Sequence, residues 1–284
     1  MGLNIMSIRI VADSCCDLPE DIIKRYNIGI VQLQVRFGEK VYLPGEISNS
    51  EFYRMMEESP VLPSTTQPTM EEMTRVYKEA LSDGSQVLAI HFSSGISGTF
   101  QGGQVAQKMI DDPRLTVFDT RKASVGCGLM VLEAARLAEQ GSDLQAIMER
   151  LEEMRERMQC IFTVGNIEYL IKGGRISRSK GTLANVLDIK PILHFDRDGY
   201  IMPLNKARGH KSAMRKILDI MESKGTNLSR QTVGLSHANS PEAAEFLQQS
   251  IQARFKPREI IVGEVGPVIG AHVGQGTYAV FFES

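Results

Sequence analysis

The chain has 284 residues, and its 32 Lys and Arg side chains nearly balance 34 Asp and Glu side chains, which gives a formal net charge of -2 at pH 7. With 42% hydrophobic and 23% charged residues, the composition is that of a globular protein and excludes disordered and fibrous classes. The charge provides no positive field for nucleic-acid phosphates, and without Trp the chain has few aromatic platforms for stacking bases. We therefore expect no nucleic-acid partner, and an interior rich in aliphatic residues and Met.

In the first half of the chain, short apolar runs alternate with helical patterns. Strands are predicted at residues 8–12, 86–91 and 115–118, and extended segments at 28–37 and 40–43. Helices are predicted at 21–26, 98–110, 126–139 and 142–158, and capping boxes at Ser48–Glu51 and Thr69–Glu72 begin two more that end at residues 58 and 81. Strands and helices in this alternation predict a parallel sheet covered by helices on both faces.

After Cys160 the pattern changes. A strand at 161–164 is followed by a Lys-, Gly-, Arg- and Ser-rich loop at 172–181, and strands at 191–195 and 200–204 flank a hairpin turn at Asp196–Gly199. Helices at 211–223 and 241–254 and strands at 232–236, 259–262 and 278–282 complete the chain. The sequence therefore predicts an α/β fold of two lobes, in which residues 1–160 carry the parallel sheet and residues 161–284 form a second α/β lobe with a mixed sheet.

The common catalytic and metal-binding signatures are absent. The chain has no P-loop, HExxH, EF-hand or GxGxxG motif, and Ser94–Gly98 has the wrong spacing for a nucleophile elbow. The four Cys and five His residues show no metal-ligand spacing, so we expect neither a metal nor a cofactor. Isolated thiols behind an N-terminus without signal-peptide features are typical of the reducing cytoplasm. Glycines interrupt the apolar stretch 265–282, so we expect no membrane insertion.

Loops rich in hydroxyl groups and glycine stand at the ends of predicted strands. Pro63–Pro68 precedes a capped helix, and Phe92–Phe100 joins a strand to a helix. Ligands of parallel sheets gather beyond the carboxyl ends of the strands, and the free N–H groups of a helix N-terminus favour an anion. The hydroxyls of Thr65, Ser93 and Ser94 would add uncharged donors, which suits a single carboxylate or phosphate. Each of these hydroxyls, taken alone, could equally be a helix cap.

Two further clusters lie in the second half. Leu170–Arg178 is a cationic loop with paired glycines, which on local grounds is typical of a solvated turn. Its charge suits an acidic partner surface or a phosphate better than the wall of an apolar cavity. Gly263–Gly276 is a glycine-rich apolar loop that contains His272. A lone His is more often structural than a ligand or base, but glycines on both sides let a backbone approach a bound molecule closely.

Seven separated motifs resemble, in the same order, those of the DegV family. They are Ala12–Ser14, Ser64–Pro68, Ser93–Thr99, Phe118–Thr120, Lys172–Ile176, Lys190–Ile192 and Ile269–Gly274, and the resemblance extends from residue 8 to residue 282. It implies two α/β lobes that hold a long-chain fatty acid without transforming it. For several members it also implies a role as the acyl-presenting subunit of a bacterial fatty acid kinase, whose separate ATP-binding subunit makes an acyl-phosphate.

The resemblance also implies roles for particular residues. By position, Thr65 and Ser94 would hold the carboxylate, His272 would reach it from the second lobe, and Ser93 would be a neighbouring donor. Arg175 would lie near the mouth of the site and engage the head group or the partner subunit. Where the family commonly has Gly-Pro-Gly-Ala after the His and Thr-Ser-Gln-Pro in the first loop, this chain has Gly-Gln-Gly-Thr and Thr-Thr-Gln-Pro. Neither departure removes a proposed donor.

The leading hypothesis is thus a cytoplasmic, non-catalytic protein that binds a fatty acid such as palmitate in an internal apolar tunnel. The alternative is a serine-dependent esterase or acyltransferase that uses Ser94, His272 and Asp119, although the missing nucleophile elbow weakens it. Labelling of Ser94 by a fluorophosphonate probe would favour the enzyme, and no labelling would favour the carrier. A third reading, an interaction scaffold, predicts no internal ligand.

Overall fold

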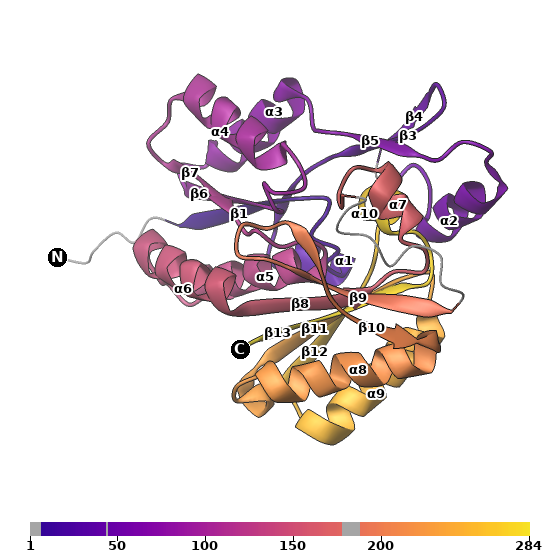
Figure 1. The fold of residues 1–284 in the computed structure, drawn as a ribbon. Helices are drawn as coiled ribbons and strands as arrows, with labels where there is room; N and C mark the ends of the chain where they lie inside the picture. Colours follow the sequence, from indigo (N-terminus) through magenta and orange to yellow (C-terminus); the bar gives the residue numbers. More distant parts are fainter. Residues whose placement is uncertain (1–6, 44, 178–187) are drawn as a thin grey trace.

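The N-terminal half of the chain is built on a four-stranded sheet, drawn in indigo and purple in Figure 1. The computed structural model describes residues 7–43, 45–177 and 188–284. All neighbouring strands of this sheet are parallel, in the order β2-β1-β6-β7. Their bounds are β1 (Ile8–Asp13), β2 (Gly29–Val31), β6 (Gln86–His91) and β7 (Leu115–Asp119).

Helices cover both faces of this sheet, as predicted. Helices α3 (Met70–Leu81) and α4 (Thr99–Ile110) pack on one face, and α5 (Val125–Glu139) packs on the other. Side chains of a strand alternate between faces, so Val87 and Ala89 share a core with α3 while Leu88 and Ile90 share one with α5. Every strand of the sheet is therefore apolar on both sides, which is usual for parallel sheets.

The C-terminal half forms a six-stranded mixed sheet in the order β10-β9-β8-β13-β11-β12. Among its neighbouring pairs only β11 and β12 run parallel. Helices α8 (Gly209–Lys224) and α9 (Pro241–Phe255) cover its outer face, seen below the sheet in Figure 1. The strands are β8 (Met158–Thr163), β9 (Ile189–Phe195), β10 (Ile201–Arg208), β11 (Thr232–Ala238), β12 (Glu259–Glu264) and β13 (Thr277–Glu283). The two-lobed α/β fold is confirmed, and the boundary at residues 160 and 161 stays a prediction.

Helix α5 joins the lobes because it packs on both sheets, against β1 and β6 on one side and β11 to β13 on the other. A helix buried on opposite sides must be apolar around most of its circumference, and α5 is. Two glycines allow the close approach: a Cβ on Gly128 would lie 2.5 Å from the Cys16 carbonyl oxygen, and one on Gly126 would lie 2.7 Å from the Phe281 ring. The four thiols are free and buried.

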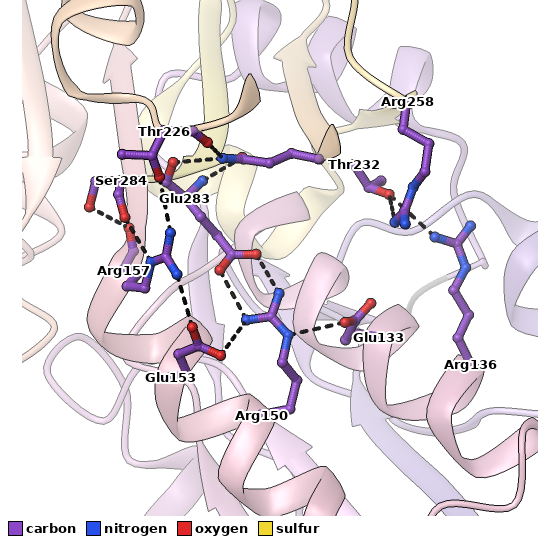
Figure 2. Close-up of polar contacts among 11 residues, drawn as sticks. Glu133, Arg136, Arg150, Glu153, Arg157, Thr226, Thr232, Arg258, Glu283 and Ser284 are labelled. Carbon is purple, nitrogen blue, oxygen red and sulfur yellow. Dashed lines mark hydrogen bonds and ion pairs between the residues drawn. The ribbon is translucent and has the colours of Figure 1, made fainter. Parts of the chain in front are cut away.

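A half-buried ion-pair network ties the lobes together (Figure 2). Arg150, on α6 (Leu144–Arg157), donates to Glu283 at the end of β13 at 2.5 Å and to Glu133 on α5 at 3.1 Å. It also donates to Glu153 at 3.2 Å. Isolated exposed pairs contribute little, but a guanidinium held by several carboxylates in fixed geometry contributes more. The network holds α5, α6 and the second sheet in one arrangement.

Several predicted details are confirmed and others are wrong. Ser48 caps α2 (Asn49–Glu58) by accepting from Glu51 N–H, and Thr69 caps α3 by accepting from Glu72 N–H, as the capping boxes predict. The helix predicted at 142–158 begins after Asp143, whose carboxylate caps it, and ends before residue 158, where β8 begins. Part of the cationic loop, residues 178–181, lies outside the described residues.

Two segments predicted as loops contain regular elements. Pro63–Pro68 includes β5 (Ser64–Thr66), which joins an antiparallel three-stranded sheet in the order β4-β3-β5. The glycine-rich loop Gly263–Gly276 includes α10 (Pro267–Val273), which begins with a proline at its first position. The remaining elements are α1 (Glu20–Arg25), α7 (Glu168–Lys172), β3 (Gln34–Phe37), β4 (Lys40–Tyr42) and a 3-10 turn at Leu228–Arg230. No helix in the described part of the chain is long and apolar enough to cross a membrane.

Candidate binding site

A cavity of about 390 Å³ lies where the lobes meet, bounded by β5, α7, α10, the start of α5 and the inner face of the six-stranded sheet. Its volume falls within the roughly 300–1,000 Å³ that is usual for small-molecule sites. The wall is mostly apolar and is formed by Leu33, Phe92, Ile96, Ala123, Phe162, Leu170, Phe195, Ile201, Val265, Val268, Ile269, Val273, Ala279 and Phe281. Such a wall suits a long hydrocarbon chain.

Thr65 and His272 both line the cavity and meet there, although they are 207 residues apart in sequence. Thr65 lies in the middle of β5, opposite Val35 of β3. His272 lies in the last turn of α10, which packs against β3 and β5. Their side chains form a hydrogen bond of 2.8 Å between Thr65 Oγ1 and His272 Nε2. The structure thus brings together two of the predicted site residues.

The His272 imidazole is neutral at physiological pH. Burial, and secondly the positive charge of Arg175, lower its pKa to about 4. Its Nδ1 atom is buried and has no hydrogen-bond partner in the described part of the chain. A Cβ on Gly173 would lie 2.4 Å from this atom, so the glycine of the Gly-Gly-Arg motif gives the ring its space. A neutral ring bonded to a hydroxyl can offer one N–H or O–H donor to an acceptor in the cavity.

Arg175 is the one charged residue among the described residues that line the cavity. Its guanidinium donates to the Ile96 carbonyl oxygen at 3.1 Å and to the Gly173 carbonyl oxygen at 2.6 Å. No carboxylate of the described residues pairs with it, and burial lowers its pKa. The expectation that this cationic loop stays out of an apolar cavity is therefore wrong for Arg175. A half-buried cation without a counter-ion favours an anionic ligand.

Ser93 and Ser94 do not line the cavity. The Ser93 hydroxyl donates to the Gly199 carbonyl oxygen at 2.7 Å, which ties the β6–α4 loop to the β9–β10 turn. The Ser94 hydroxyl donates to Asp119 Oδ2 at 2.5 Å, and its N–H donates to Asp119 Oδ1 at 3.1 Å. Their role in holding a carboxylate stays a prediction. In this arrangement both hydroxyls fix the loop that carries Ile96, the residue whose carbonyl holds Arg175.

The esterase alternative requires contacts that this arrangement lacks. A nucleophilic serine needs a base within hydrogen-bond reach, and the base needs an orienting group. Here Ser94 bonds directly to Asp119, while His272 bonds to Thr65, so the pair of Ser94 and His272 that this alternative requires does not form. The geometry therefore favours binding over nucleophilic chemistry.

Six further polar residues line the cavity without having been singled out from the sequence: Thr66, Gln67, Ser97, Ser124, Ser236 and Thr277. Gln67 follows Thr65 in the same motif, and Ser97 follows Ile96 in the hydroxyl-rich loop. Ser97 Oγ lies 2.9 Å from Thr99 Oγ1. Both lie inside motifs already recognised, but which members of a motif face a cavity depends on the backbone path. Within the described residues, no group of three or more His, Cys, Asp or Glu side chains is placed to hold a metal ion.

Comparison with known sequences decides the family. A family model described as "Uncharacterised protein, DegV family" matches residues 7–284. The chain belongs to the DegV family. A DegV domain-containing protein of Caldanaerobacter subterraneus is 35% identical over 277 residues, which cover 97% of this chain and 98% of that relative. Protein DegV of Bacillus subtilis is 32% identical over 97% of this chain and 98% of its own length.

Solved structures of DegV proteins share the fold. A structure titled as fatty acid binding of a DegV family protein from Thermus thermophilus has a TM-score of 0.92 and 34% identity, and covers 98% of this chain and 100% of that one. The crystal structure of DegV from Bacillus subtilis, titled a fatty acid binding protein, has a TM-score of 0.87 and 32% identity, with 97% and 98% covered.

Proposed function

We propose that this DegV protein binds one long-chain fatty acid, such as palmitate, with its tail in the apolar cavity and its carboxylate at the end formed by Thr65, Arg175 and His272. The observation that carries the proposal is that Arg175, the one charged lining residue among the described residues, has no carboxylate partner there and faces a mostly apolar cavity. Two solved DegV structures with more than 30% identity to this chain are titled as fatty acid binding, which supports it.

The energetics suit this ligand. Each methylene moved from water into an apolar site contributes about 0.8 kcal/mol, so a sixteen-carbon tail supplies on the order of 10 kcal/mol before the costs of binding. The carboxylate gives up its hydration at the buried end, and a guanidinium together with uncharged hydrogen-bond donors compensates for that loss. A fatty acid therefore matches both the apolar wall and the polar end.

The purified protein should carry a fatty acid of about 14 to 18 carbons in roughly equimolar amount, because the tail contributes most of the binding free energy. Adding palmitate to delipidated protein should raise the melting temperature through mass action. Organic extraction followed by mass spectrometry, and thermal denaturation with and without palmitate, measure the two effects. Extracts without lipid, combined with no thermal shift, would overturn the proposal.

Replacing Thr65 by Val or His272 by Phe should weaken palmitate binding by roughly 5- to 100-fold, because a buried carboxylate then loses a donor. A fatty alcohol of the same length should be affected less, since its head group carries no charge. Ser94→Ala tests the prediction that Ser94 also holds the carboxylate. If this variant loses as much palmitate affinity as Thr65→Val does, the Ser94 hydroxyl lies at the carboxylate. If none of these variants binds palmitate more weakly than the parent, the head group lies elsewhere.

We further propose that the protein acts in the cytoplasm as a carrier that presents the carboxylate to a separate ATP-dependent fatty acid kinase subunit. In that step a carboxylate oxygen attacks the terminal phosphorus of ATP, the bond to ADP breaks, and an acyl-phosphate forms. Gln67 and Thr66 line the cavity near Thr65 and are exposed, so the polar end reaches the surface. Loaded protein mixed with ATP and a cognate kinase subunit should yield acyl-phosphate and ADP, and either component alone should not. No product from the complete mixture contradicts this role.

A further inference from the structure

One polar side chain interrupts the apolar wall of the cavity without a partner. Ser236, on β11, lines the cavity and is only 1% exposed. Its hydroxyl has no hydrogen bond to any part of the chain that the structure describes. A buried hydroxyl that makes no hydrogen bond is costly, so its place in a ligand cavity indicates that the ligand or a water molecule bonds to it.

The surroundings of Ser236 are polar on one side. Gly234 precedes Ser236 by two residues and therefore faces the same side of β11. A Cβ on Gly234 would lie 2.7 Å from the Val125 side chain, so this side of β11 packs closely against the start of α5. The neighbouring Ser124 also lines the cavity and donates to Asp17 at 2.6 Å. The wall beside the start of α5 thus carries two hydroxyls, of which Ser124 is bonded to protein and Ser236 is free for a ligand.

Ser236 lies beside the middle one of three cavity-lining positions on β13. It pairs with Ala279 of β13, and Thr277, Ala279 and Phe281 line the cavity at alternate positions of that strand. Thr277 bonds to the Val273 carbonyl oxygen, next to the proposed head-group residue His272, and Phe281 packs near Gly126 of α5. Successive lining positions on a strand are about 7 Å apart, so Ser236 lies one step from the head-group end and Phe281 lies one step deeper.

From this juxtaposition we propose that the cavity accepts a fatty acid that carries a hydroxyl or oxo group in mid-chain, which hydrogen-bonds to Ser236. The proposal rests on the fatty-acid binding proposed above and specifies the class of acyl chain. A plain chain leaves the Ser236 hydroxyl facing methylenes, whereas an oxygenated chain satisfies it.

The test compares stearate with stearate hydroxylated in mid-chain, on delipidated parent protein and on Ser236→Ala, by isothermal titration. The parent should bind the mid-chain hydroxy acid at least as tightly as stearate. Ser236→Ala should shift the two affinities in opposite directions, several-fold weaker for the hydroxy acid and several-fold tighter for stearate, so that their ratio changes by about tenfold. Stearate hydroxylated next to the carboxylate should follow plain stearate, and Ser229→Ala, an exposed serine outside the cavity, is the matched control.

Each other outcome has a distinct meaning. If Ser236→Ala changes both affinities in the same direction and by the same factor, the side chain only shapes the cavity and the proposal is wrong. If the parent binds stearate ten times more tightly than the mid-chain hydroxy acid, a water molecule is the better partner for Ser236 and the proposal is again wrong. If no acid binds the parent, the proposed fatty-acid function itself fails, which the stearate titration reveals separately.

Discussion

Replacing Arg175 by Met should weaken palmitate binding by roughly 10- to 100-fold, the range expected when a buried carboxylate loses a charged hydrogen-bond partner. The guanidinium is already positioned by the Ile96 and Gly173 carbonyl oxygens, so it needs little reorganisation to meet an anion. Burial lowers its pKa, which means that its charge is poorly compensated until a carboxylate arrives. Titration of delipidated protein with palmitate measures the loss.

Two controls separate this head-group role from a structural one. A fatty alcohol of the same length should bind Arg175→Met at least as well as it binds the parent, because no anion is lost and no half-buried cation remains. Arg121→Met is the matched protein control, since Arg121 also donates to a backbone carbonyl oxygen, that of Arg197, but lies outside the cavity. If Arg175→Met binds palmitate as the parent does yet fails in acyl-phosphate formation, Arg175 contacts the kinase subunit instead.

The elements that sequence reasoning predicted are those specified by local patterns. Buried parallel strands such as β1 and β6 are continuous apolar runs, and the capping boxes that begin α2 and α3 lie within four residues. β5 was not predicted because it has three polar residues and exists through pairing with β3, about thirty residues earlier. α10 was not predicted because the segment is rich in glycine, which disfavours helices. It nevertheless carries a start signal, the proline at its first position, and a stop signal, Gly274 with a φ of 70° at its end.

The candidate site likewise has residues that the sequence points to and residues that only tertiary packing brings in. The Thr65 and His272 pair could be predicted only through family motifs, because nothing local links β5 to α10. The local pattern around Arg175 is typical of a solvated loop, and only the family resemblance implies a place near the mouth of the site, because charge says nothing about where Gly173 and Gly174 turn the chain. Ser236 had no signal at all: a single serine in a strand is as often a small spacer as a ligand contact. Cavities are made by tertiary packing, and their walls are drawn from many distant segments.

The contribution of Asp17 to the free energy of unfolding should fall as the pH rises from about 4 to about 7, whereas the lowered pKa of His272 acts in the opposite direction. This carboxyl accepts hydrogen bonds from Ser124 Oγ and Gly266 N–H, yet burial raises its pKa from 3.8 to about 7. Below pH 4 it is protonated in both the folded and the unfolded chain. Between pH 4 and pH 7 the Asp17 carboxyl is ionised in the unfolded chain but still protonated in the folded chain. This difference favours unfolding by about 1.4 kcal/mol per pH unit. Above pH 7 both states are ionised and the loss is complete.

Asp17→Asn should therefore be more stable relative to the parent at pH 8 than at pH 5, by about 2 to 3 kcal/mol, because an amide does not ionise. Asn also tolerates the left-handed backbone of this position, where φ is 46°, and can still accept from Gly266 N–H. Urea denaturation of delipidated protein followed by circular dichroism measures the difference, since the chain has no Trp to report fluorescence. Asp198→Asn, at an exposed turn, is the control: its free energy of unfolding should differ from that of the parent by the same amount at pH 5 and at pH 8. If the difference between Asp17→Asn and the parent is also the same at both pH values, the prediction is wrong. The Asp17 carboxyl is then already ionised at pH 5, and its contacts with Ser124 and Gly266 outweigh the cost of burial.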